Sequence, residues 1–149
     1  MDYQYLEDFH PGQVFESEPL TVSEAEIIEF AQKYDAQPMH IDPVAAQDIT
    51  GGLIASGWHT AALTMNRFIT AGFYNPAPGA LGLGCESLKW PKPVRPGDAL
   101  RLRLEVLSVR PSARRPGSGV ITNRFTTLNQ DNDIVLEMIS SVIIARRSA

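Results

Sequence analysis

Two residues that together could transfer protons, Asp35 and His40, stand five positions apart in the chain. A carboxylate and an imidazole can take, hold and return a proton near neutral pH, as general acid–base catalysis requires. Pro38 lies between them and disfavours helical geometry at the preceding residue, so a sharp turn is expected there. The two side chains can then converge on one water molecule. Spacing alone leaves a second interpretation open, since Asp at helix ends and His in turns also occur without a chemical role.

A helix is predicted immediately before this pair. Residues 23–34 carry apolar side chains at positions 27, 30, 31 and 34, which share one helical face. Ser23 followed by Glu26 is typical of a capping box at a helix start. The helix is therefore expected to begin at Ser23 and to end near Asp35, which places the carboxylate at the turn.

Two further helices are predicted downstream. Asp42 and Pro43 are typical of a helix cap and first helical residue, and that short helix should end before residues 50–52. Residues 58–71 contain no glycine or proline, and their first two turns are apolar on nearly all sides, which indicates a buried helix. Such a helix spans roughly 22 Å, enough to cross a small sheet.

From residue 80 onward the pattern becomes extended. An early strand around residues 13–20 precedes four longer strands, which are predicted at residues 80–90, 100–109, 120–128 and 134–145. Apolar residues occupy every second position up to Val106 and then change to the other strand face, which predicts a bulge. Gly82 and Gly84 lie on one strand face and permit close approach by the helix or by a ligand. We expect a single α+β domain over residues 1–149, with an antiparallel sheet wrapped around one long helix.

Composition narrows the functional classes. The chain has 44% hydrophobic and 20% charged residues, which is ordinary for a soluble globular protein. No stretch approaches the ~20 apolar residues of a membrane span. The first residues are acidic and unlike a signal peptide, and the single Cys85 cannot form an internal disulfide, so a cytoplasmic location is expected. The chain has only three histidines and one cysteine, without paired spacing, so no structural zinc site is expected.

Charge is distributed unevenly along the chain. The net charge is −4, yet residues 89–115 hold eight basic and two acidic residues. Nucleic-acid binding normally calls for a basic domain, which this is not. The charge of this segment suits a small polyanionic ligand, such as the phosphate-bearing part of a cofactor. A solvated strand face followed by a hairpin loop explains the same charges equally well, and both interpretations stay open.

The motifs resemble those of the MaoC-like dehydratases, which include the (R)-specific enoyl-CoA hydratases of the hot-dog fold. The family motif Asp-x-Asn-Pro-x-His-x-Asp, placed after a helix, corresponds to residues 35–42. Residues 54–58 and 93–98 match further motifs, so the resemblance covers nearly the whole chain. Two positions depart from the commonest pattern: Gln37 replaces the usual Asn, and Ser56 stands where many relatives have His.

The resemblance implies reversible addition of water across the C2–C3 double bond of a 2-enoyl thioester, with acyl-CoA as the expected substrate. Asp35 and His40 would hold the attacking water, with Asp35 as the main base. The backbone N–H of Gly57 would stabilise charge that develops on the thioester oxygen. Ser56 and Trp58 flank Gly57 and are expected to contact the substrate.

A coenzyme A substrate would also give the cationic segment a function. Arg114 and Arg115 lie on the loop between Pro111 and Gly119. Arginine suits the geometry of phosphate groups, so we expect these two residues to bind the phosphates of coenzyme A. Coenzyme A would enter as part of the substrate, so no separate cofactor is expected. Open sheet edges favour self-association, and we expect a homodimer or higher homo-oligomer.

Two other functions stay open. A hot-dog thioesterase binds the same ligand class, but its water attacks the carbonyl carbon and releases a thiol. A non-catalytic acyl-thioester binding module would have no need of both Asp35 and His40. Fold alone cannot decide among these functions. The remaining polar candidates have structural interpretations: Asp42 as a helix cap, His59 as a packed side chain and His10 as a turn residue.

Overall fold

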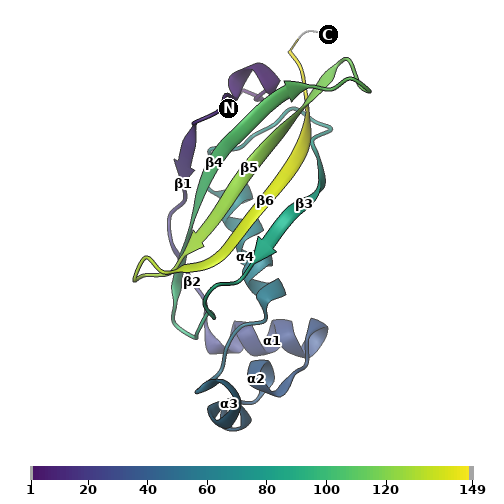
Figure 1. Cartoon of the computed structure of the whole chain (residues 1–149). Coiled ribbons are helices and arrows are strands. Elements are labelled where there is room, and N and C mark those ends of the chain that lie inside the picture. Colours follow the sequence, from purple (N-terminus) through teal and green to yellow (C-terminus); the bar gives the residue numbers. More distant parts are fainter. Residues whose placement is uncertain (1, 148–149) are drawn as a thin grey trace.

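The computed structural model describes residues 2–147. Figure 1 shows a single antiparallel sheet with helix α4 packed against one face and three shorter helices gathered beyond one end of the sheet. Within the described residues the elements are η1 (Leu6–Asp8), β1 (Val14–Glu16), β2 (Leu20–Thr21), α1 (Glu24–Tyr34), α2 (Pro38–Ile41), α3 (Pro43–Thr50), α4 (Gly57–Thr70), β3 (Leu81–Lys89), β4 (Ala99–Pro111), β5 (Ser118–Leu128) and β6 (Ile134–Ala145).

Local side-chain signals set the helix ends. The Ser23 hydroxyl accepts from the backbone N–H of Glu26 at 3.1 Å, and the Glu26 carboxylate accepts from the Ser23 N–H at 3.3 Å, which confirms the capping box. Helix α1 ends at Tyr34, and Asp35 follows it as the C-cap with non-helical backbone angles. Asp42 caps α3 as predicted, by accepting from two N–H groups in its first turn. Helix α3 runs slightly further than predicted, up to Gly51, whose left-handed φ of 69° ends it.

The sheet has the order β1-β4-β5-β6-β3, with β2 paired to β4 beyond β1, and all pairings are antiparallel. The four long strands lie where alternation predicted them, and the early strand is divided into β1 and β2. A register shift between Val106 and Ser108 confirms the predicted bulge. Strand β3 is an edge strand whose residues 81–86 are exposed. The sheet therefore ends in an uncovered strand on that side.

Helix α4 packs against the sheet, as the α+β prediction required. Phe68 of α4 contacts Phe125 of β5 within the main hydrophobic cluster, with ring centroids 5.1 Å apart. The prediction that α4 is buried on nearly all sides is wrong for the single chain. Trp58, Met65 and Ile69 are 61%, 48% and 53% exposed. One sheet covers only one side of a helix, so the opposite apolar stripe has no cover within the described residues.

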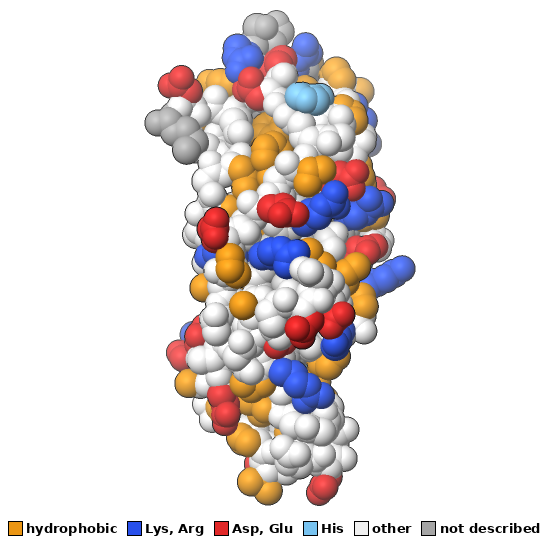
Figure 2. Space-filling view, turned by 90° about the vertical axis from the view of Figure 1, so that its left-hand side faces the viewer, with side chains coloured by type: hydrophobic (Ala, Val, Ile, Leu, Met, Phe, Trp, Pro, Cys, Tyr) orange, Lys and Arg blue, Asp and Glu red, His pale blue; other side chains and the backbone are white. Residues whose placement is uncertain are grey.

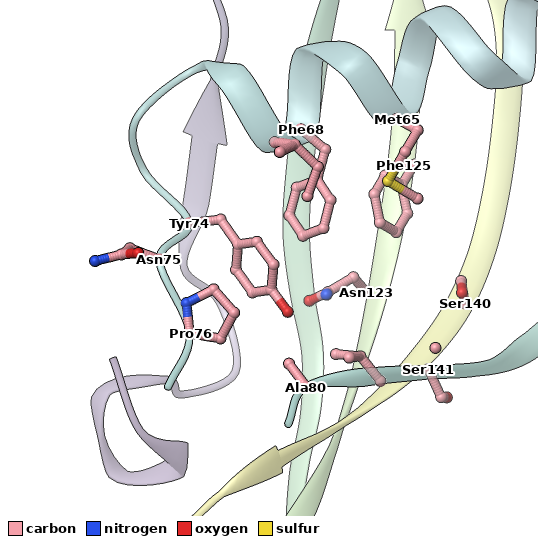
Figure 3. A pocket seen from close by; sticks show the side chains of 13 residues that line it. Met65, Phe68, Tyr74, Asn75, Pro76, Ala80, Asn123, Phe125, Ser140 and Ser141 are labelled. Carbon is pink, nitrogen blue, oxygen red and sulfur yellow. The ribbon is translucent and has the colours of Figure 1, made fainter. Parts of the chain in front are cut away.

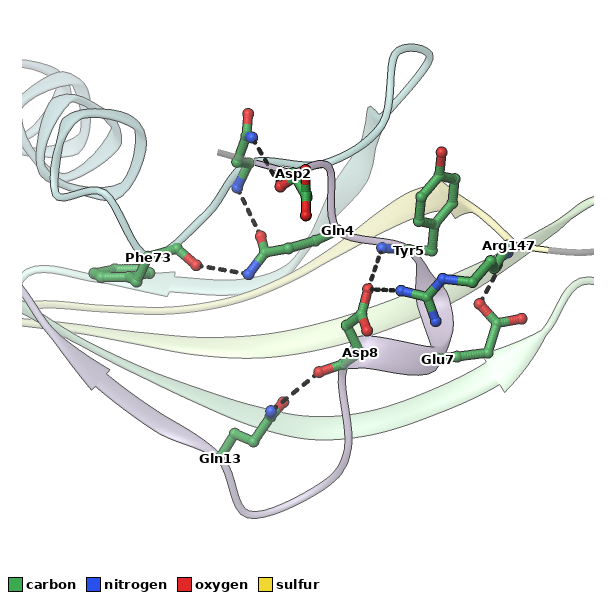
Figure 4. Close-up of polar contacts among 9 residues, drawn as sticks. Asp2, Gln4, Tyr5, Glu7, Asp8, Gln13, Phe73 and Arg147 are labelled. Carbon is green, nitrogen blue, oxygen red and sulfur yellow. Dashed lines mark hydrogen bonds and ion pairs between the residues drawn. The ribbon is translucent and has the colours of Figure 1, made fainter.

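The N-terminal segment is fixed to two distant parts of the chain (Figure 4). The Arg147 guanidinium pairs with the Asp8 carboxylate at 2.6 Å, and the Arg147 backbone N–H donates to Glu7 at 2.9 Å. The Gln4 side chain donates to the Phe73 carbonyl at 3.0 Å, beyond the end of α4. These contacts hold the connection between α4 and β3 against the end of the sheet.

On the side of the molecule where β1 forms the edge of the sheet, charged side chains of both signs are interspersed (Figure 2). Arg103 lies 4.0 Å from Glu16, and Arg124 pairs with Glu105 at 2.9 Å. Part of the cationic segment is therefore a solvated strand face with acidic neighbours. Within residues 2–147, no helix has the length and apolar character needed to cross a membrane.

Candidate active site

The structure brings Asp35 and His40 together at the junction of α1 and α2. A carboxylate oxygen of Asp35 lies 3.4 Å from Nε2 of His40. Pro38 occupies the first position of the single-turn helix α2, which carries His40 back toward the end of α1. The His40 and Asp35 side chains are only 7% and 19% exposed. The turn predicted from Pro38 thus produces a partly shielded carboxylate–imidazole pair.

Hydrogen bonds to the carboxylate keep Asp35 ionised. The Ser56 hydroxyl donates to one carboxylate oxygen at 2.6 Å, and the Gln37 amide donates to the other at 2.7 Å. The bond from Ser56, then the bond from Gln37, and lastly the charge of His40 hold the pKa of Asp35 below its ordinary value. Gln37 at the usual Asn position therefore contacts the catalytic candidate directly.

The backbone fixes the orientation of the imidazole. Nδ1 of His40 lies 2.7 Å from the Ile54 carbonyl oxygen. A carbonyl only accepts hydrogen bonds, so Nδ1 carries the proton in the neutral ring. Nε2 then presents a lone pair on the side that faces Asp35. Two acceptors 3.4 Å apart are compatible when the ring is protonated or when a water molecule donates to both.

The pair opens into a cavity of about 440 Å³ at the start of α4. Its lining combines a few polar side chains with aromatic and aliphatic ones, the combination expected for a small-molecule site. The lining residues are Asp35, Gln37, His40, Ile54, Ala55, Gly57, Trp58, Thr60, Trp90, Lys92, Pro93 and Val94.

Gly57 is the first residue of α4, so its N–H lacks an intrahelical acceptor, and the residue lines the cavity. Ser56 caps the helix by accepting from the Trp58 N–H at 3.3 Å while it donates to Asp35. A methyl group on Gly57 would lie 2.6 Å from the Trp90 indole. Glycine is therefore required here by close packing against Trp90.

Several residues at this site were missed by sequence reasoning. Trp90 and Lys92 line the cavity, and Lys92 forms an ion pair with Asp133. Arg95 donates to the Thr50 carbonyl at 2.8 Å and so fixes the segment that leads into the site. Pro91, Pro93 and Pro96 after β3 are typical of a loop, but nothing in this segment alone shows that the loop folds over α4.

Other predicted residues lie elsewhere. Arg114 and Arg115, on the β4–β5 hairpin, line a separate cavity with Leu83, at the end of the sheet remote from α2 (Figure 1). His59 is packed, as predicted: its ring stacks on Phe30 with centroids 4.6 Å apart, and burial lowers its pKa. Among residues 2–147, no group of three His, Cys, Asp or Glu side chains converges on a common point suited to a metal ion.

The model of the MaoC like domain matches residues 8–129. The chain belongs to this family. A MaoC-like dehydratase from Rhodospirillum rubrum is 41% identical and superposes with a TM-score of 0.90, over 98% of this chain and 99% of that one. The 3-hydroxybutyryl-CoA dehydratase of Methylorubrum extorquens is 31% identical over 115 residues, which are 74% of this chain and 69% of that protein.

The fold predicted from the motifs is confirmed as the hot-dog fold. A Mycobacterium tuberculosis protein with a double hotdog fold superposes with a TM-score of 0.78 at 21% identity, over 97% of this chain and 44% of that one. The family includes hydratases and dehydratases.

Proposed function

We propose that this protein catalyses reversible hydration of a 2-enoyl thioester, with acyl-CoA as the expected substrate. One observation carries the proposal: Asp35, His40 and Gly57, the first residue of α4, line the same cavity. Water activation and carbonyl polarisation, the two requirements of this reaction, are thereby met within one site. The dehydratase name of the Methylorubrum relative supports the same reaction class.

The geometry suggests how the water is held. A water molecule between the pair can donate one O–H to the Asp35 carboxylate and the other to Nε2 of His40. Its oxygen lone pairs then remain free to attack C3 of the enoyl group. As the C3–O bond forms, the water proton passes to Asp35, with His40 orienting the water and sharing the charge. The pair returns a proton to C2, so the reaction consumes one water and leaves the protein unchanged.

Negative charge develops on the thioester oxygen during attack at C3. The Gly57 N–H lies at the N-terminus of α4, where unpaired N–H groups and the helix dipole favour negative charge. Loss of one such preorganised donor typically lowers kcat by roughly 10²–10³. The rings of Trp58 and Trp90 meet edge to face beside Gly57, with centroids 5.2 Å apart. They would line the space that holds the acyl group.

We further propose that the active form is a homodimer paired through β3. Leu81 and Leu83 of this edge strand are 57% and 56% exposed. Twofold antiparallel pairing sets the start of one β3 against the end of the other. Because Leu83 shares a cavity with Arg114 and Arg115, such pairing carries those arginines of the partner subunit toward the dyad cavity. They would then meet the coenzyme A phosphates.

Charge reversal tests this assignment. Arg114→Glu with Arg115→Glu should raise the Michaelis constant for an acyl-CoA and leave that for the matching acyl-pantetheine, which lacks the nucleotide phosphates, unchanged. If the variant and the wild type have equal Michaelis constants for acyl-CoA, these arginines do not bind the phosphates. Light scattering of Leu83→Lys, which should favour the monomer, tests the dimer separately.

The reaction itself is tested by following crotonyl-CoA at the absorbance band of its enoyl thioester, together with a free-thiol assay. We expect the absorbance to fall without thiol release. Thiol release would instead indicate a thioesterase. No change with crotonyl-CoA or with longer and branched 2-enoyl-CoA substrates would indicate a binding module.

A further inference from the structure

The segment between α3 and α4 carries the carbonyl that orients His40. Helix α4 itself rests on the sheet through its second half, where Phe68 and Phe125 line an apolar cavity (Figure 3). Residues 51–56 belong to no helix or strand, so contacts outside regular structure must fix their backbone. Within this segment the Ile54 carbonyl oxygen lies 2.7 Å from Nδ1 of His40. A group that holds this segment therefore also holds the imidazole.

Two adjacent glycines make the start of this segment intrinsically flexible. Thr50 is the last residue of α3, and Gly51 and Gly52 follow it. Their φ values are 69° and 134°, in a region that other residues rarely adopt. Glycine loses more conformational freedom on folding than any other residue, so contacts are needed to hold it in one conformation. The position of the Ile54 carbonyl is therefore not determined by the end of α3 alone.

Arg95, on the loop between β3 and β4, binds the backbone on both sides of this bend. Its guanidinium donates to the Thr50 carbonyl at 2.8 Å and to the Gly52 carbonyl at 3.3 Å. Arginine presents its donors in a rigid planar fork, so one side chain can hold two carbonyls at once. The preceding residue adds a main-chain bond, since the Ala55 N–H donates to the Val94 carbonyl at 2.9 Å. One loop thus holds the segment before and after the carbonyl that orients the imidazole.

The charge of Arg95 is directed at these carbonyls. Among residues 2–147 its guanidinium takes part in no ion pair. The neighbouring Asp98 carboxylate accepts instead from the Arg95 backbone N–H, at 2.9 Å. Thr50 ends α3, where unpaired carbonyls and the helix dipole favour a cation. Arg95 does not line the dyad cavity, so its contribution there is to hold other groups in place.

We propose that Arg95 is a positioning residue for His40, a role that rests on the proposed function only where turnover is concerned. By fixing residues 50–54, it holds the Ile54 carbonyl against Nδ1. This carbonyl keeps the proton on Nδ1 and leaves the lone pair of Nε2 directed toward Asp35. Without Arg95 the glycine pair loses its anchor, the carbonyl moves, and the ring exchanges between its two neutral tautomers. Only the tautomer with the proton on Nδ1 can accept a hydrogen bond from water at Nε2.

The tautomer of His40 can be measured without any substrate. In protein labelled with ¹⁵N-histidine, a ring nitrogen has different chemical shifts with and without a proton, and His40→Ala identifies the signals of this residue. At alkaline pH, where a histidine ring is neutral, the wild type should carry the proton on Nδ1 alone. Arg95→Met keeps most of the side-chain volume and removes the donors. It should show a mixture of the two tautomers.

Arg101→Met is the matched control. Arg101 also donates to a backbone carbonyl, that of Asn129 at 3.4 Å, but it belongs to strand β4 and does not bind residues 50–56. This variant should keep the wild-type tautomer. If Arg95→Met does not fold, Arg95→Gln takes its place and should also give a mixture, because glutamine is uncharged and too short to reach both carbonyls. The proposal is overturned if the folded variant at position 95 keeps the proton on Nδ1 alone, if Arg101→Met gives the same mixture, or if the wild type itself lacks the Nδ1–H form.

Turnover provides an independent measurement. A displacement of about 1 Å can lower a rate by roughly a hundredfold. Arg95→Met should therefore lower kcat by about 10- to 100-fold for the enoyl-CoA that the wild type hydrates. The Michaelis constant should stay nearly the same, because Arg95 does not line the cavity. Wild-type kcat in a variant with mixed tautomers would overturn the link to catalysis. An inactive wild type whose tautomer still depends on Arg95 would contradict the proposed function and retain the positioning role.

Discussion

Replacing Gly57 by alanine tests how closely the start of α4 packs on Trp90. The added methyl group lies 2.6 Å from Cε2 and 2.8 Å from Cδ2 of the indole. Carbon atoms in contact stand about 3.5–4.0 Å apart, so the indole or the helix end must move by about 1 Å. Overpacking of this kind destabilises a protein by roughly 1–3 kcal/mol. The φ of Gly57 is not positive, so backbone strain adds nothing to this figure.

A double-mutant cycle isolates the contact. In a Trp90→Ala background the new methyl group has space, and Gly57→Ala should be neutral or stabilising by up to about 1 kcal/mol. Urea unfolding of the four proteins measures both changes. Gly82→Ala, where a methyl group meets no atom within 4 Å, is the control and should not destabilise. The packing argument is refuted if Gly57→Ala destabilises equally in both backgrounds.

Three further changes have expected outcomes. Ser56→Ala removes the principal hydrogen bond that lowers the pKa of Asp35, so that pKa should rise. Because Asp35 acts as a base only when it is ionised, the acid limb of the pH–rate profile should move to higher pH. Gly119→Ala sets a methyl group 2.2 Å from Leu6 and 2.7 Å from a backbone carbonyl, so thermal unfolding should show a loss of at least about 1–3 kcal/mol. Asp42→Ala removes the cap of α3 and should lower stability, in chemical denaturation, by about 0.5–2 kcal/mol.

The sequence predicted those features that depend on neighbouring residues. The capping box of Ser23 and Glu26, the cap at Asp42 and the bulge after Val106 follow from short-range preferences. The meeting of Asp35 with His40 belongs to this group, because a single turn separates them. Family motifs added Gly57 and Ser56 by resemblance, and they predicted the hot-dog fold.

Contacts between distant segments were not predictable from local patterns. Trp90 reaches Gly57 only because the loop after β3 folds over α4. The remoteness of Arg114 from the dyad depends on the length and direction of the β4–β5 hairpin. The exposed face of α4 also escaped prediction, since an apolar stripe does not reveal whether it is covered by the same chain.

Catalysis by the Asp35–His40 pair is tested by comparing variants in crotonyl-CoA hydration. Asp35→Asn preserves shape and removes the base, and His40→Ala removes its partner; both should lower kcat by at least about a hundredfold while circular dichroism stays native. Asp42→Asn, a conservative change at a cap near the pair, should retain wild-type turnover. Wild-type turnover by folded Asp35→Asn would contradict the account.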